Sequence, residues 1–305
     1  MKKSDFIKLT KPRVEQSVEH LKNIEKSVQE NPDLPPMLKK LDVLPRGKHI
    51  EENVIYVNGV GNDYTAAEKN RDHVQKYFSG HSVKLIHNAT KKIIDDRIGI
   101  VGDLPECVAD YTWGIGAAAE KITGPILNPA TISSIAVFTV AKERNLPLGI
   151  VGSSQGTLIT FNAILALTIL ETNSIEYLRE CVRVCHTGVV IPQQIRIRID
   201  SLVNKYVDCV NKKDPVANII GLTPNLNNSL IPLVLANLKF HYVPYYLPVS
   251  NHVFDYYRRE TDLDEHEPYV KKDFFVNPPL QKNPNDTNQS SKKWLEPILS
   301  TMMSG

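Results

Sequence analysis

The chain has 305 residues, of which 42% are hydrophobic and 23% are charged, as is ordinary for a globular protein with a sizeable core. Its 36 basic and 34 acidic side chains leave a formal net charge of +2. Proteins that neutralise the phosphates of DNA or RNA usually carry a basic excess. The near balance of charge therefore argues against nucleic acid as the main partner.

Several other classes of protein are disfavoured as well. The four cysteines are Cys107, Cys181, Cys185 and Cys209. They are too sparse for a disulfide scaffold and lack the paired spacing of a zinc site, so we expect free thiols and no metal. No run approaches the ~18 apolar residues that span a bilayer. Charged residues soon after Met1 interrupt any secretory signal, which predicts a cytoplasmic protein without a transmembrane segment.

Residues 1–45 are predicted to form an N-terminal helical extension. Apolar residues at spacings of 4, 3, 3 and 4 place one stripe along a helix, which prolines at 32, 35 and 36 would end. The stripe consists of Val14, Val18, Leu21, Ile24 and Val28. Such a helix either packs on the main domain or serves as an arm that binds a partner.

Strands alternate with helices from residue 53 onward, within a core that we assign to residues 46–275. The expected strands are 54–58, 82–87, 147–152, 182–188, 205–210 and 239–246. The expected helices are 65–78, 155–171 and a stretch over 103–144 that is interrupted by Gly114, Gly116, Gly124 and Pro129. This alternation predicts an α/β fold, with a mainly parallel open sheet and helices on both faces.

Two further segments do not fit this alternation directly. Residues 195–200 alternate as a strand would, but they lie between strands that need a crossover if they are parallel, so we expect a short helix there. Residues 276–305 are interpreted as a polar linker followed by a closing C-terminal helix, because Pro, Asn, Ser and Lys dominate before Trp294.

The most informative segment is Gly152-Ser153-Ser154-Gln155-Gly156, a G-x-S-x-G motif between an expected strand and an apolar helix. A sharp strand-to-helix turn would hold Ser154 in a strained backbone conformation, for which the glycines leave room. Its hydroxyl would be exposed beside a helix N-terminus, which favours developing negative charge. The competing interpretation is a glycine-rich turn with a capping serine. Ser153 is the neighbouring candidate, but only Ser154 has the central position.

This motif in its setting resembles the α/β-hydrolase family, over roughly residues 53–258. The resemblance implies a catalytic triad in the order serine, acid, histidine, with the acid after a late strand and the histidine after the last one. Asp214 follows the expected strand 205–210, and His252 follows 239–246. His252 would take the proton of Ser154 and return it to the leaving group. Asp214 would hold the imidazole in the correct tautomer.

Other residues compete for the two partner roles. Asp208 lies inside an expected strand, where it should point into a helix layer, whereas Asp214 should lie on a loop at the carboxyl edge of the sheet. The competing histidines are His186 and His241, within strands, and His266, in an acidic run. None of them has the position that the resemblance requires.

An acyl-transfer site also needs donors for the oxyanion. The candidates are the backbone N–H groups of Gln155 and of Val60, which lies in the loop after the first core strand. The family often has His-Gly in that loop, and Asn58-Gly59 leaves the backbone donor intact. A dinucleotide site is not expected, because the third glycine of the fingerprint is missing. Residues 103–130 either cover the site as a lid, lined by residues such as Trp113, or are ordinary packed helices.

We therefore expect serine-dependent hydrolysis of a carboxylic ester, lipid esters and thioesters included, through an acyl-enzyme and without metal or organic cofactor. The partner would be a small-molecule or lipid ester substrate. Two alternatives stay open, because this fold hosts many functions. A non-catalytic binding protein of the same fold would have a distorted triad. An acyltransferase would have a site shielded from water, with room for a second alcohol.

Overall fold

The computed structural model describes residues 1–30, 54–77, 83–89, 99–191 and 193–209. Asp214, His252 and the strand expected at 239–246 lie outside the described residues, as do the proposed boundaries of the core and the segment 276–305. No helix in the described part is long and apolar enough to cross a membrane.

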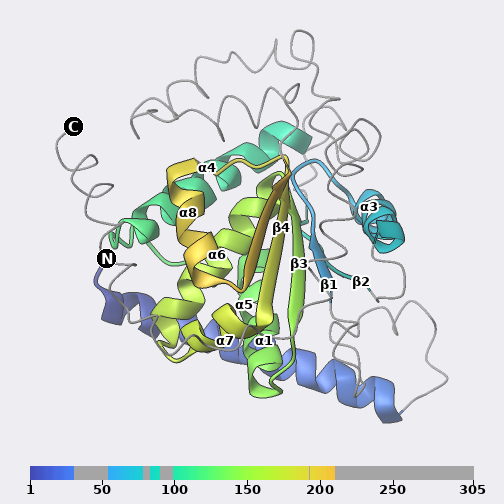
Figure 1. The fold of residues 1–305 in the computed structure, drawn as a ribbon, viewed down its shortest axis with the longest axis horizontal. Helices are drawn as coiled ribbons and strands as arrows, with labels where there is room; N and C mark the ends of the chain where they lie inside the picture. The colour runs from blue at the N-terminus through green and yellow to red at the C-terminus, as the bar shows by residue number, and fades with distance from the viewer. Residues whose placement is uncertain (31–53, 78–82, 90–98, 192, 210–305) are drawn as a thin grey trace, which may run out of the picture.

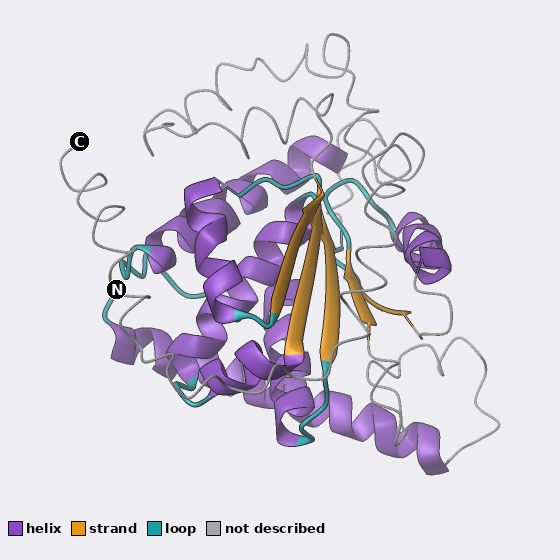
Figure 2. Ribbon diagram, viewed as in Figure 1, coloured by secondary structure: helices purple, strands orange, loops and turns teal. Residues whose placement is uncertain are grey.

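Five parallel strands form one open sheet with the order β2-β1-β3-β4-β5 (Figure 2). The strands are β1 (Val54–Val57), β2 (Val83–Ile86), β3 (Leu148–Ser153), β4 (Val182–Thr187) and β5 (Lys205–Cys209). Each pair of neighbours is parallel, and the register places Gly152 opposite His186 and Ser153 opposite Thr187. The prediction of an α/β fold with a parallel open sheet is confirmed in this part of the chain.

Both faces of the sheet are covered, as continuous burial along β1 and β3 requires. Side chains of β1 alternate between the faces: Ile55 and Val57 face the helices α5 (Pro129–Glu143) and α6 (Gln155–Leu170). Tyr56 faces the other way, where its hydroxyl hydrogen-bonds the side chains of Ser153 and Asn70.

The helices divide between the faces because the direction of travel across the sheet reverses. The chain runs from β1 to one edge at β2, then back across β1 to β3, β4 and β5. Right-handed crossovers then put the first connection on one face and the later ones on the other. The first is α3 (Tyr64–Tyr77). The later ones are α4 (Gly99–Ala118), α5 (Pro129–Glu143), α6 (Gln155–Leu170), α7 (Ser174–Cys181) and α8 (Gln193–Leu202). In Figure 1, α3 lies on the other side of the sheet from α5 and α6.

The segment 195–200, whose sequence is compatible with either a strand or a helix, forms most of α8, as expected. Ile199 is fully buried, and Arg196 is nearly so. The alternation of apolar and polar residues there did not produce a strand, because β4 and β5 are parallel neighbours and their connection must cross back over the sheet. The short helix α7 was not anticipated.

The N-terminal helix α1 (Lys3–Glu30) packs along α5, so it belongs to the packed fold. Its buried stripe begins earlier than predicted: Phe6 and Thr10 have no exposed surface, and the Phe6 ring centroid lies 5.6 Å from that of Trp113. At the other end, both carboxylate oxygens of Glu25 accept hydrogen bonds from the guanidinium of Arg144. The interpretation of a helix packed on the domain is supported over that of an arm.

Helix α4 corrects one detail of the sequence prediction, because Gly114 and Gly116 lie inside it and do not interrupt it. They allow close packing instead: a Cβ at Gly114 would lie 2.4 Å from Oδ1 of Asn162 on α6, and one at Gly116 would lie 2.5 Å from the carbonyl oxygen of Lys121. Trp113 is buried and donates a hydrogen bond of 2.9 Å to the carbonyl of Gly124. Ordinary helix packing, the alternative to a lid, describes this segment.

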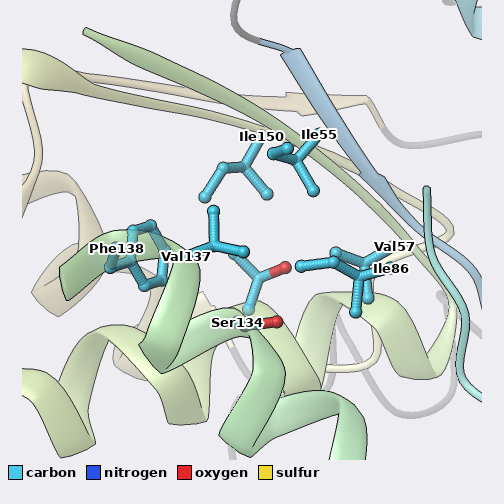
Figure 3. A pocket seen from close by; sticks show the side chains of 8 residues that line it. Ile55, Val57, Ile86, Ser134, Val137, Phe138 and Ile150 are labelled. Atoms are coloured by element: carbon cyan, nitrogen blue, oxygen red, sulfur yellow. The ribbon is translucent and has the colours of Figure 1, made fainter. Parts of the chain in front are cut away.

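An apolar gap lies between the sheet and helices α5 and α6 (Figure 3). Its lining is Ile55, Val57, Ile86, Ser134, Val137, Phe138, Ile150 and Thr160. The gap has no room for a water molecule, and the hydroxyls of Ser134 and Thr160 are bonded to carbonyls of their own helices. It is therefore a packing gap in the core, separate from the site described next.

Close packing of α4 on α6 makes a testable prediction. Gly114→Ala should lower the free energy of unfolding by about 1–3 kcal/mol, because the added methyl group meets Asn162 and the Phe161 ring. Gly124→Ala is the matched control: nothing lies within 4 Å of its Cβ position, so the change should stay within about 0.5 kcal/mol. Urea unfolding followed by circular dichroism measures both. Equal stability of the two variants would contradict the packing.

Candidate active site

Ser154 sits at the turn between β3 and α6 with φ 54° and ψ −122°. A positive φ is rare for a residue with a Cβ and costs on the order of 1–3 kcal/mol, so surrounding contacts must enforce it. Two glycines allow those contacts. A Cβ at Gly152 would lie 2.8 Å from the carbonyl oxygen of Gly156, and one at Gly156 only 2.1 Å from that of Val57. The strained turn expected from the motif is present.

Ser154 is the only residue between 148 and 167 that is not buried. It is the N-cap residue of α6, yet its side chain makes no capping hydrogen bond. The Ser154 backbone carbonyl instead accepts hydrogen bonds from the N–H and the hydroxyl of Thr157, at 2.9 and 2.7 Å. The interpretation of a capping serine is therefore wrong. Ser153, the neighbouring candidate, is only 6% exposed.

The loop after β1 lies directly against the Ser154 side chain. A Cβ at Gly59 would lie 2.6 Å from Cβ and 3.1 Å from Oγ of Ser154, so no larger residue fits there. The order β2-β1-β3 makes the gap between β1 and β3 the point where connections leave in opposite directions. In open α/β sheets, ligands bind in the crevice that this divergence opens at the carboxyl ends of the strands.

The orientation of the Val60 N–H follows from the peptide that joins it to Gly59. The Gly59 carbonyl accepts hydrogen bonds from the side-chain amides of Asn58 at 2.9 Å and Asn62 at 3.3 Å. No peptide bond in the described part is cis, so the Val60 N–H points away from these two amides. Asn62 also donates to the Val60 carbonyl at 2.9 Å. The side chains of Asn58 and Asn62 thus hold this loop through its carbonyl groups, and neither of them bonds to the Val60 N–H.

A buried polar network, which sequence analysis missed, lies beneath the turn. Gln155 has no exposed surface; its Nε2 donates to Oδ2 of Asp110 at 2.9 Å, and its Oε1 accepts from Nδ2 of Asn88 at 2.7 Å. Asn128 donates to the same Asp110 oxygen at 2.9 Å. Asn58 directly follows β1, and Asn88 lies two residues after the end of β2, so both had a positional signal in the sequence. Asp110 lies within α4, where no pattern in the sequence marked it as a site residue.

Burial raises the pKa of Asp110 from its ordinary value of 3.8 to about 6. The amide hydrogen bonds from Gln155 and Asn128 oppose that shift, and the nearby charge of Glu106 adds to it. Asp110 is 6% exposed, so water screens its carboxyl group little. Asp110 is therefore a buried carboxylate at neutral pH that takes up a proton under mildly acidic conditions.

His186 is not suited to be the general base. It has no exposed surface, and burial, assisted by the charge of Arg196, lowers its pKa to about 3. Its Nδ1 lies 3.2 Å from the hydroxyl of Tyr206, inside the sheet layer. Asp208 lies within β5 as expected, but the structure does not describe its side chain. Asp214, His241, His252 and His266 all lie outside the described residues.

Within the described residues, no group of three or more His, Cys, Asp or Glu side chains is arranged to hold a metal ion. Cys107, Cys181 and Cys185 are thiols outside any disulfide, as expected for them. The structure thus brings together Ser154, Gln155 and the loop that carries Val60. One hydroxyl side chain and two backbone segments thus meet at the carboxyl ends of β1 and β3.

The raised pKa of Asp110 predicts a pH dependence of stability. Between pH 3.8 and about 6, the folded state holds this proton more tightly than the unfolded state. The contribution of Asp110 to the free energy of unfolding should therefore fall as pH rises through this window, by up to about 3 kcal/mol, and stay constant above it. Asp110→Asn removes the titration. The stability difference between wild type and variant should fall from pH 4 to pH 7 in urea unfolding. A constant or rising difference would refute this.

Comparison with known proteins identifies no relative: no family model matches the sequence, and no curated protein and no solved structure matches it significantly. The function must therefore be inferred from the geometry and chemistry of the Ser154 site itself.

Proposed function

We propose that this protein is a serine hydrolase of the α/β-hydrolase fold, which cleaves a carboxylic ester through an acyl-enzyme formed on Ser154. The proposal depends on three observed properties of Ser154: its backbone conformation, its exposure and its position in the sheet. Ser154 is a strained residue with partial exposure in an otherwise buried run, at the carboxyl edge of the central strand, with the β1 loop against its side chain. Strain at a single exposed polar residue is typical of functional sites.

The strand order supports the assignment of the partners. Carboxyl ends of parallel strands meet at one edge of a sheet, so residues just after different strands can converge there. Ser154 follows β3, and Asp214 comes five positions after the last residue of β5. In the α/β-hydrolase family the acid follows such a late strand and the histidine comes after the next. His252 has that place in the sequence.

The chemistry would run in two stages. The Ser154 oxygen attacks the ester carbonyl while His252 takes the hydroxyl proton, and Asp214 stabilises the imidazolium. The carbonyl oxygen becomes an oxyanion that accepts hydrogen bonds from the N–H groups of Gln155 and Val60. Collapse breaks the bond to the alcohol, which leaves with the proton from His252. Water then attacks the acyl-enzyme by the same route and releases the acid.

A fluorophosphonate probe tests the nucleophile directly, because it modifies only an activated serine. We expect labelling of the wild-type protein, with the modified peptide containing Ser154. Ser154→Ala should abolish labelling, and Ser153→Ala, which changes the adjacent buried hydroxyl, should retain it. Peptide mapping by mass spectrometry gives the site. Labelling at another serine would overturn the assignment, and no labelling at all would favour a non-catalytic binding protein.

A second prediction separates the two candidate acids. Asp214→Asn should keep the melting temperature but lower turnover of a short-chain ester by about 10⁴, as loss of the correct histidine tautomer does in serine triads. Asp208→Asn, within β5, should change the melting temperature more than the turnover. The opposite pattern would transfer the role of the acid to Asp208 without affecting the assignment of Ser154.

A further inference from the structure

An unbroken set of buried hydrogen bonds connects α4 to the residue after the nucleophile. The Asp110 carboxylate accepts from Nε2 of Gln155 at 2.9 Å, and Asn88 donates to Oε1 of Gln155 at 2.7 Å. Both polar ends of the Gln155 side chain are therefore fixed. All three side chains are at most 6% exposed, so little water competes for these bonds.

The same network continues to the second candidate oxyanion donor. The Asn88 N–H donates to Oδ1 of Asn58 at 2.8 Å, and Nδ2 of Asn58 donates to the Asn88 carbonyl at 3.0 Å. Nδ2 of Asn58 also donates to the carbonyl of Gly59 at 2.9 Å, in the peptide that carries the Val60 N–H. The network thus joins the backbone segments that present both donors.

The Asp110 carboxylate anchors this network because a second hydrogen bond holds it in place. Oδ2 also accepts from Asn128, whose own Oδ1 caps α5 by accepting from the N–H of Ala130. Burying a carboxylate is costly, and in the described part no cation pairs with this one. Hydrogen bonds to an ionised acceptor are stronger than those between neutral groups.

Gln155 needs such anchoring because it is the first residue of α6. The first N–H groups of a helix have no intrahelical acceptor, so the helix ladder does not fix their direction. An oxyanion donor must nevertheless be in place before the reaction, since its benefit depends on preorganisation. The side chain of Gln155 can supply the constraint that its own N–H lacks.

We propose that Asp110 is a positioning residue of the Ser154 site, which acts through the Gln155 side chain to fix the backbone N–H that receives the oxyanion. This inference rests on the proposed acyl-transfer function. It assigns a role to a side chain on α4, 45 positions from Gln155, that the triad chemistry does not use.

Three variants test this on the full-length protein: Asp110→Ala, Asp110→Asn and Asn162→Ala. Asp110→Ala should lower both kcat on a short ester and the rate constant of fluorophosphonate labelling by about 10–100-fold, with KM within about twofold. Asp110→Asn should stay within about threefold of wild type, because one amide oxygen in place of Oδ2 can accept both hydrogen bonds. Asn162→Ala removes a 2.9 Å hydrogen bond to the backbone carbonyl of Asp110 but leaves both bonds of its carboxylate in place and does not reach Gln155, so kcat should be unchanged.

Gln155→Met provides a second route if Asp110→Ala does not fold. It keeps the backbone N–H and a similar volume but loses both anchoring bonds, so it should lower kcat to the same extent. Where both fold, the double variant should show no further loss, since the two residues act as one unit. Assays are run at least 15 °C below the lowest melting temperature, so that the folded fraction is the same in every variant.

The outcomes separate the two proposals. Wild-type labelling at Ser154 with unchanged kcat in Asp110→Ala and Gln155→Met would overturn the positioning role and leave the hydrolase proposal intact. Equal loss of kcat in Asp110→Ala and Asn162→Ala would show that Asp110 has only a structural role, which also overturns it. A wild-type protein that is neither labelled nor active would overturn both.

Discussion

The close approach of helix α6 to strand β1 is the constraint on which the rest of the site depends. There is no space for a Cβ at Gly156, whose position would fall 2.1 Å from the Val57 carbonyl oxygen, or at Gly59, where it would meet Ser154. Only glycine permits backbones to come this near. The contact brings the start of α6 and the loop after β1 together at the point where the sheet connections diverge. The contact of the Ser154 side chain with the loop after β1 depends on it.

A strained residue persists only where its surroundings leave no alternative conformation. At Ser154 those surroundings are of two kinds. Its N–H donates to the Thr187 carbonyl at 3.0 Å, which ties the turn to β4, and its carbonyl is held by Thr157. Beyond them, apolar packing of α4, α5 and α6 fixes the helix that follows, with α1 as an outer support. The free energy of packing in the core thus offsets the local cost of the turn.

Burial has a different consequence for the polar groups beneath the turn. Asp110, Gln155, Asn58 and Asn88 are removed from water, so each must find its partners inside the protein. Because these bonds lie in a poorly hydrated interior, they are more directional and harder to replace than surface bonds would be. The same burial raises the pKa of Asp110 and lowers that of His186, which leaves one buried group sensitive to mild acid and another neutral throughout the physiological range.

Sequence alone determined the five described strands, the main helices and the turn at Ser154, because each has a local signal: a β-branched run, an apolar helix or glycines at fixed spacing. It also predicted α8 from connectivity, and it placed Asp214 and His252 by resemblance, at positions outside the described residues. Tertiary structure alone decided that Gly114 and Gly116 serve helix packing, and that His186 is too buried to be a base. It alone revealed Asp110, because the bond to Gln155 spans 45 positions. No local pattern encodes such a contact, which forms only when α4 packs on α6.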